Sequence, residues 1–131
     1  MDSSTIELPG SEIEAIIFEA GKLTIRFSRV IIIKTMSGSD ERTRWWQAGA
    51  LIFENAELET VLPTCPCICD GGDVGENVYT YRDMIPIPLQ SQGRAGCDLR
   101  IRDQQPLKAW AEGVRLEMDD RPRYIEHIRH P

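Results

Sequence analysis

Apolar and polar side chains alternate one by one in three separate segments, and this pattern constrains the fold more than any other feature. The segments are residues 22–28, 97–101 and 114–118. In the first of them, Leu23, Ile25 and Phe27 are separated by polar residues. Successive side chains of a β-strand point to opposite faces of its sheet, so this period of two predicts antiparallel strands with one buried face.

The segments between these strands favour further strands and tight turns. Residues 13–18 are rich in strand formers, and Gly21 allows a turn that pairs them with 22–28 as a hairpin. Pro86 and Pro88 cannot donate to a ladder, so 84–89 is expected to be an edge strand or a bulged one. For 107–118 we expect one long strand with a bulge at Gly113; the alternative is a short helix over 107–112.

These elements predict an all-β protein. We expect about eight or nine strands in an antiparallel meander that forms a small barrel or sandwich, with at most one short helix. The chain is expected to form a single domain over residues 1–131. Residues 60–77 hold three cysteines, two prolines and three glycines, so we expect a long irregular loop there.

Val30–Ile33 is apolar at four consecutive positions, so both faces of this strand should be covered. Either another layer of the fold or a second copy of the chain could cover it. The second case predicts a homodimer, and self-association is therefore one expected property.

The charge is acidic and unevenly distributed. Fifteen Lys and Arg stand against 21 Asp and Glu, a net charge of −6, and no Lys or Arg lies between Arg44 and Arg82. We therefore expect no nucleic-acid partner. The acidic stretch is a candidate surface for capping a basic protein partner, or else simply a solvated surface. Its carboxylates are Glu54, Glu57, Glu59, Asp70, Asp73 and Glu76.

The ends and the longest apolar runs of the sequence bear on localisation. No apolar run approaches the ~18 residues of a membrane-spanning helix. The N-terminus lacks the basic start and apolar stretch of a signal peptide. We therefore expect a cytoplasmic protein without a membrane partner.

Four cysteines form the most unusual local feature. Cys65, Cys67 and Cys69 are each separated by one residue, and Cys97 stands apart. Structural zinc sites usually separate paired cysteines by two to four residues, so that the chain can wrap the ion. We therefore favour free thiols acting as small apolar fillers over a metal site or a disulfide, and we expect no cofactor.

Trp45 and Trp46 are adjacent, so a strand would point them to opposite faces. With Arg42 and Arg44 they have the composition of a protein-binding hot spot, although a place in the core is favoured for the inward ring.

No nucleophile elbow, P-loop, zinc-protease or dinucleotide motif is present, so we expect no enzyme. The favoured function is a small acidic protein that binds a protein partner or assembles with itself, for example an inhibitor of a basic enzyme. The alternative is a barrel that carries an apolar ligand in a lumen lined by Phe18, Phe27, Trp46 and Phe53. A third hypothesis is a metal-binding protein that uses Cys65–Cys69.

Overall fold

The computed structural model describes residues 3–36, 38 and 41–128, and these residues form ten strands and no helix. The strands are β1 (Ser3–Glu19), β2 (Lys22–Thr35), β3 (Arg42–Phe53), β4 (Glu57–Leu58), β5 (Cys67–Glu76), β6 (Tyr79–Arg82), β7 (Met84–Ile87), β8 (Gln90–Ile101), β9 (Leu107–Met118) and β10 (Arg123–Ile128). The prediction of an all-β antiparallel protein is confirmed.

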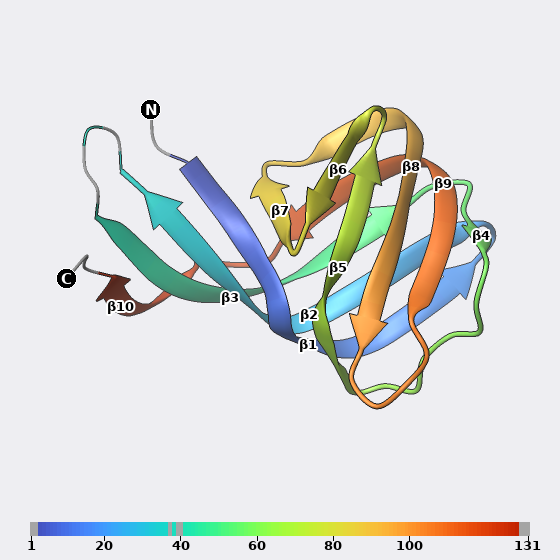
Figure 1. The fold of residues 1–131 in the computed structure, drawn as a ribbon, viewed down its shortest axis with the longest axis horizontal. Coiled ribbons are helices and arrows are strands. Elements are labelled where there is room, and N and C mark those ends of the chain that lie inside the picture. Colours follow the sequence, from blue (N-terminus) through green and yellow to red (C-terminus); the bar gives the residue numbers. More distant parts are fainter. Residues whose placement is uncertain (1–2, 37, 39–40, 129–131) are drawn as a thin grey trace.

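Six of these strands close into a barrel. The order around it is β1-β2-β3-β9-β8-β5, and each neighbouring pair is antiparallel. The ring closes where β5 returns to β1, with Ser11 opposite Cys69 and Ile13 opposite Cys67 (Figure 1). Closure removes the two long edges that an open six-stranded sheet would leave.

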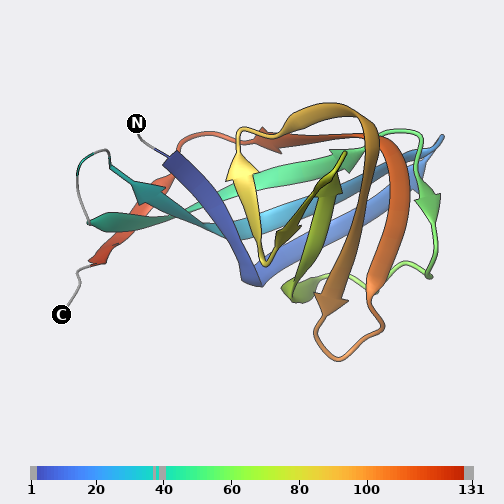
Figure 2. The same cartoon turned by 45° about the horizontal axis from the view of Figure 1, so that its top comes forward.

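Three neighbouring strands, β1, β2 and β3, continue beyond the barrel. The first part of β1, the last part of β2 and the first part of β3 form a sheet with β7 and β10 outside them, in the order β7-β1-β2-β3-β10. We call this five-stranded part the extension (Figure 2). The two remaining strands are short: β6 pairs with β5, and β4 pairs with β9.

Alternation decides which side chains fill the barrel. The inward positions of the predicted segments are buried, as at Leu23, Ile25 and Phe27, which are at most 1% exposed. β9 alternates through residues 107–111 as well, so the strand is confirmed and the helix over 107–112 is not present. The glycine turn between β1 and β2 also forms, with positive φ at both Ala20 and Gly21.

The irregular loop expected over residues 60–77 is much shorter than predicted. Residues Cys67–Glu76 form β5, a strand of the barrel wall that pairs with β1, β6 and β8. Glycines weaken a strand by intrinsic preference. Here pairing on both sides overrides that preference, because the partners satisfy the backbone groups of β5.

The apolar run in β2 is largely covered within one chain. Val30, Ile32 and Ile33 are 1%, 2% and 8% exposed, and Ile32 lies opposite Ile6 on one side and Trp45 on the other. Burial of this run therefore requires no second copy of the chain.

The aromatic lining expected for a carrier lumen does not assemble. Phe27 and Phe53 are buried in the packed core, but Phe18 is 37% exposed. The guanidinium groups of Arg29 and Arg123 lie 5.2 and 5.0 Å from the ring centroid of Trp46, which belongs to the extension and not to the barrel. Within the part of the chain that the structure describes, no helix is long and apolar enough to cross a membrane.

Candidate binding groove on β8 and β9

Two β-bulges disturb the barrel wall at the same level. The backbone N–H of Glu54 donates to the carbonyl of Gly113, and the carbonyl of Glu54 accepts from the N–H of Glu112. Two residues of β9, Glu112 and Gly113, therefore lie opposite the single residue Glu54. This is the bulge predicted at Gly113. On the other side of β9, the register with β8 shifts between Gln92 and Ala95, which places an extra residue in β8. Bulges bend strands and redirect side chains, and they are frequent beside functional sites.

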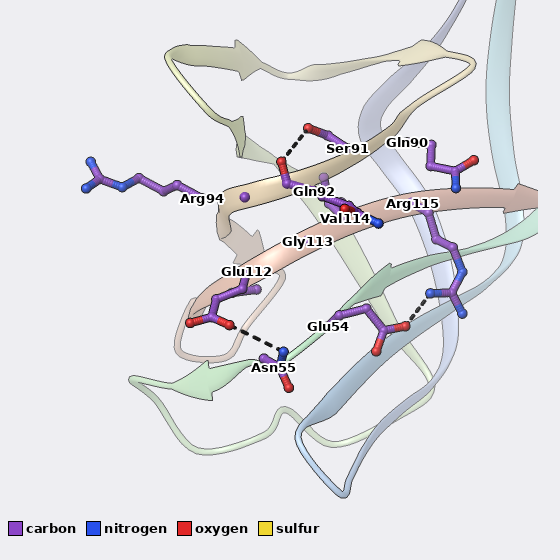
Figure 3. A pocket seen from close by; sticks show the side chains of 12 residues that line it. Glu54, Asn55, Gln90, Ser91, Gln92, Arg94, Glu112, Gly113, Val114 and Arg115 are labelled. Atoms are coloured by element: carbon purple, nitrogen blue, oxygen red, sulfur yellow. Dashed lines mark hydrogen bonds and ion pairs between the residues drawn. The ribbon is translucent and has the colours of Figure 1, made fainter.

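A cavity of about 810 Å³ opens at this level. Its polar lining comes from the turn after β3 and from the outer faces of β8 and β9, as Figure 3 shows. Arg115 forms an ion pair with Glu54, and the side-chain amide of Asn55 donates to Glu112 at 3.3 Å. The remaining polar lining residues are Gln90, Ser91, Gln92 and Arg94.

Two further cavities continue this one along the barrel wall. The second, of about 430 Å³, shares Arg94 with the first. The third, of about 470 Å³, shares Asp73, Asp98 and Lys108 with the second. We call the three together the β8–β9 groove. Its floor follows the outward residues of β8, which are the even-numbered positions from Gln90 to Arg100.

Trp110 lies in the middle of this groove and is 55% exposed. Its indole N–H donates to a carboxylate oxygen of Glu59 at 2.6 Å, which fixes the ring. The ring also lies close to the sheet, because a Cβ added at Gly96 would be 3.5 Å from Cε3 of Trp110. The result is a large aromatic surface that is held in place yet open to solvent.

The formal charges along the groove balance. The acidic lining residues are Glu54, Glu59, Asp73, Asp98 and Glu112, and the basic ones are Arg82, Arg94, Arg100, Lys108 and Arg115. Glu117 and Glu54 raise the pKa of Arg115, so that guanidinium stays charged. The groove is therefore polar and neutral, although the whole chain carries −6.

The carboxylates of the predicted acidic surface do not form one open patch. Asp70 binds Arg102 through both oxygens, which lowers the pKa of Asp70, and Asp73 binds Arg82 at 3.0 Å. The hydroxyl of Tyr81 donates to Glu76, and this bond raises the pKa of Tyr81 to about 12. Glu54 and Glu59 lie in the groove, and Glu57 is exposed on β4.

The tryptophan pair lies on the extension, and its rings face opposite sides as predicted. Trp45 packs against the core, its ring edge-on to Tyr124 at 5.2 Å, while Lys34 lies 4.5 Å above it. Arg44 binds Glu126 at 2.6 Å, and Arg42 is exposed beside them. This surface is separate from the β8–β9 groove.

The cysteines do not come together as a metal centre. Among the described residues, no group of three or more His, Cys, Asp or Glu side chains is placed to hold an ion. Cys67, Cys69 and Cys97 are buried in the core, and Cys65 is half-buried with its Sγ 3.9 Å from that of Cys67. All four are free thiols.

Sequence reasoning missed Trp110 and Arg94. The signal for Trp110 was its position in β9, where it lies between Lys108 and Glu112 on the polar face of an alternating strand. No comparable signal marks Arg94.

Comparison of the chain with protein-family models, curated proteins and solved structures finds no match.

Proposed function

We propose that this is a non-enzymatic binding protein whose ligand lies in the β8–β9 groove. The observation that carries the proposal is the continuity of three adjoining cavities along one face of the barrel, with the fixed and exposed ring of Trp110 at their centre. Binding sites are concave surfaces in which a few fixed groups orient the ligand.

The charges that line the groove favour this proposal over a basic protein partner, an apolar ligand or a nucleic acid. A basic protein partner would be attracted by unpaired carboxylates, but Asp70, Asp73 and Glu54 each pair with an arginine of the same chain. An apolar ligand would need a lining with few charged groups, whereas five acidic and five basic side chains line this groove. Its balanced charge also gives no attraction for nucleic acid.

The test applies the labelled protein to arrays of immobilised glycans and of immobilised peptides. In the variant Asp98→Trp, a bulky side chain fills the part of the groove shared by the second and third cavities. Its matched control is Thr24→Trp, at a strand position of β2 away from the groove. We expect binding that is lost in Asp98→Trp and kept in Thr24→Trp.

Arg94→Trp provides a second obstruction, between the first and second cavities, should Asp98→Trp fold poorly. Thermal unfolding of each variant checks that it is folded. An absence of binding to both arrays, or binding that neither obstruction reduces, would contradict the proposal.

A further inference from the structure

We infer that the ligand of the β8–β9 groove is an uncharged saccharide chain, which packs one sugar ring on Trp110. This inference rests on the proposed function, because it names the class of ligand for the same groove. Three features of the groove carry it: the aromatic surface, the polar groups around it, and its length and neutrality.

The aromatic surface suits the face of a sugar ring. One side of a pyranose presents C–H groups, and an aromatic face is electron-rich and apolar, so the two pack together. Trp110 meets the geometric requirement, because the hydrogen bond to Glu59 holds its ring close to the backbone at Gly96 while 55% of the residue remains exposed.

The floor beside Trp110 lets a ring approach the sheet closely. Gly96 lies directly opposite Trp110 on the neighbouring strand, and Gly75 lies directly opposite Gly96 on the next. Neither glycine carries a side chain; Gly96 is buried beside the Trp110 ring and Gly75 is partly exposed, so no side chain of these two positions stands between that ring and β5. A Cβ at Gly96 would lie 2.7 Å from the carbonyl oxygen of Ala109, so this position excludes larger residues.

Hydrogen-bonding groups of both kinds surround that floor. Asp73 and Asp98 supply acceptors and Lys108 supplies donors, while Asn77 and Thr80 offer both. Sugar hydroxyls donate and accept, so a mixed set of partners matches them better than it matches an ion. The third cavity continues this pattern with Arg82 and Arg100.

The length and neutrality of the groove favour a chain over a single sugar. From Gln90 to Arg100 the groove follows β8 for roughly 30 Å, since a strand rises about 3.3 Å per residue. Its formal charges balance, so it favours no sulfated or uronic-acid polymer. We therefore expect affinity to increase with the number of sugar residues.

The experiment titrates the 131-residue chain with neutral hexasaccharides of glucose, xylose, mannose and N-acetylglucosamine and measures binding by calorimetry. For the saccharide that binds, Trp110→Ala should weaken binding at least about tenfold, the equivalent of ~1.4 kcal/mol. Trp110→Phe keeps an aromatic face and should retain part of the affinity. Tyr124→Ala is the matched control, because Tyr124 is also 55% exposed but lies on the extension.

The outcomes separate this inference from the proposed function. A peptide that binds in the groove, with no saccharide binding, would contradict the saccharide and leave the proposed function standing. Saccharide binding that neither Trp110→Ala nor Asp98→Trp weakens would contradict the saccharide inference and also the proposed function of this groove. Preference for a sulfated saccharide, with affinity falling steeply as salt increases, would contradict the neutral ligand.

Discussion

Burial divides the four cysteines into one accessible thiol and three protected ones. Cys67, Cys69 and Cys97 are at most 9% exposed, whereas Cys65 is half-buried. Burial also raises the pKa of Cys67 and of Cys97 to about 12, so their reactive thiolate forms are rare near neutral pH. The sequence predicted an irregular loop around Cys65, Cys67 and Cys69; strand β5 instead places Cys67 and Cys69 in the barrel wall.

We therefore expect one thiol of the native, reduced protein to react quickly with a disulfide reagent at pH 8, and three to react only on unfolding. Absorbance of the released thiol dye gives the stoichiometry. Cys65→Ser should remove the fast phase and leave the slow one. Rapid reaction of two or more thiols in native protein would show that the core around β5 opens readily.

The raised pKa of Cys97 also makes stability depend on alkaline pH. The unfolded thiol loses its proton near its ordinary pKa of 9.0, while the folded thiol keeps it up to about 12. Over that interval the unfolded state binds fewer protons, so the free energy of unfolding falls as pH rises. Urea unfolding between pH 8 and about pH 11 should show this fall, and Cys97→Ala should make it shallower. An unchanged slope in Cys97→Ala would assign the pH dependence to other groups.

Strand β5 depends on a glycine where it meets β8. Gly72 has a φ of +132°, and a Cβ there would contact the carbonyl oxygen of Asp98 and lie 2.8 Å from Cα of Leu99. Gly10, in β1, also has a positive φ, but its added Cβ would meet nothing within 4 Å. Substituting alanine at each of the two positions therefore separates the cost of backbone strain from the cost of a steric clash.

We expect Gly10→Ala to cost about 1–2 kcal/mol of stability, the cost of a left-handed backbone for an L-residue. Gly72→Ala should cost clearly more, at least about 3 kcal/mol, because the clash adds to the strain. Urea unfolding of both variants measures the difference. Equal losses would indicate that β8 can move aside without cost.

The extension buries a continuous apolar row across its strands. The row crosses four neighbouring strands, from β7 through β1 and β2 to β3. Its members, each opposite the next, are Ile85, Ile6, Ile32 and Trp45. Ile32→Glu would place a carboxylate in this row and should destabilise the chain by several kcal/mol. Because the row is covered within one chain, this loss should not depend on protein concentration. Ile17→Glu, at an apolar position that is 46% exposed, is the control with little expected effect. A loss that disappears at high concentration would instead point to cover by a second copy.

At the level of elements, sequence patterns located the strands in which apolar and polar residues alternate. They missed β5, whose residues do not favour extended structure. β2, β9 and β10 follow from alternation or from β-branched and aromatic residues. β5 does not, because only its partners β1, β6 and β8 make a strand of Gly71, Gly72 and Gly75. The ion pairs of the acidic stretch do not follow from the sequence for a related reason, since Asp70 and its partner Arg102 are 32 residues apart in sequence.

For the molecule as a whole, β10 is an exposed edge strand of the extension that lies outside the barrel. It pairs only with β3 among the described strands, and Arg123–His127 are all exposed. Ending the chain at Asp120 keeps the carbonyl groups of Asp119 and Asp120 that accept from the Gln47 amide. We expect the truncated barrel to fold with native near-ultraviolet circular dichroism at low concentration, apart from the signal of Tyr124 and Trp45. Loss of cooperative thermal unfolding would show that β10 is needed for the barrel itself.

The groove lay beyond sequence reasoning because four separated stretches line it, among them β5 and β6 with Asp73 and Arg82. Glu54 and Asn55 follow β3, Arg94 lies in β8 and Trp110 in β9. Two bulges must also fall at one level before the first cavity opens. Alternation could place Trp110 on an outward face, but only the closed barrel brings it beside Gly96 and Gly75.

Closure of the ring has a further consequence for aggregation. Exposed strand edges are templates on which other chains can add in register and grow into fibrils. The strands that hang outside the ring are β4, β6, β7 and β10, with two, four, four and six residues. An edge strand this short can form only a few backbone hydrogen bonds with another chain. Along residues 42–46 of the twelve-residue β3, β2 pairs with one edge and β10 with the other, so β10 keeps that second edge from serving as a template.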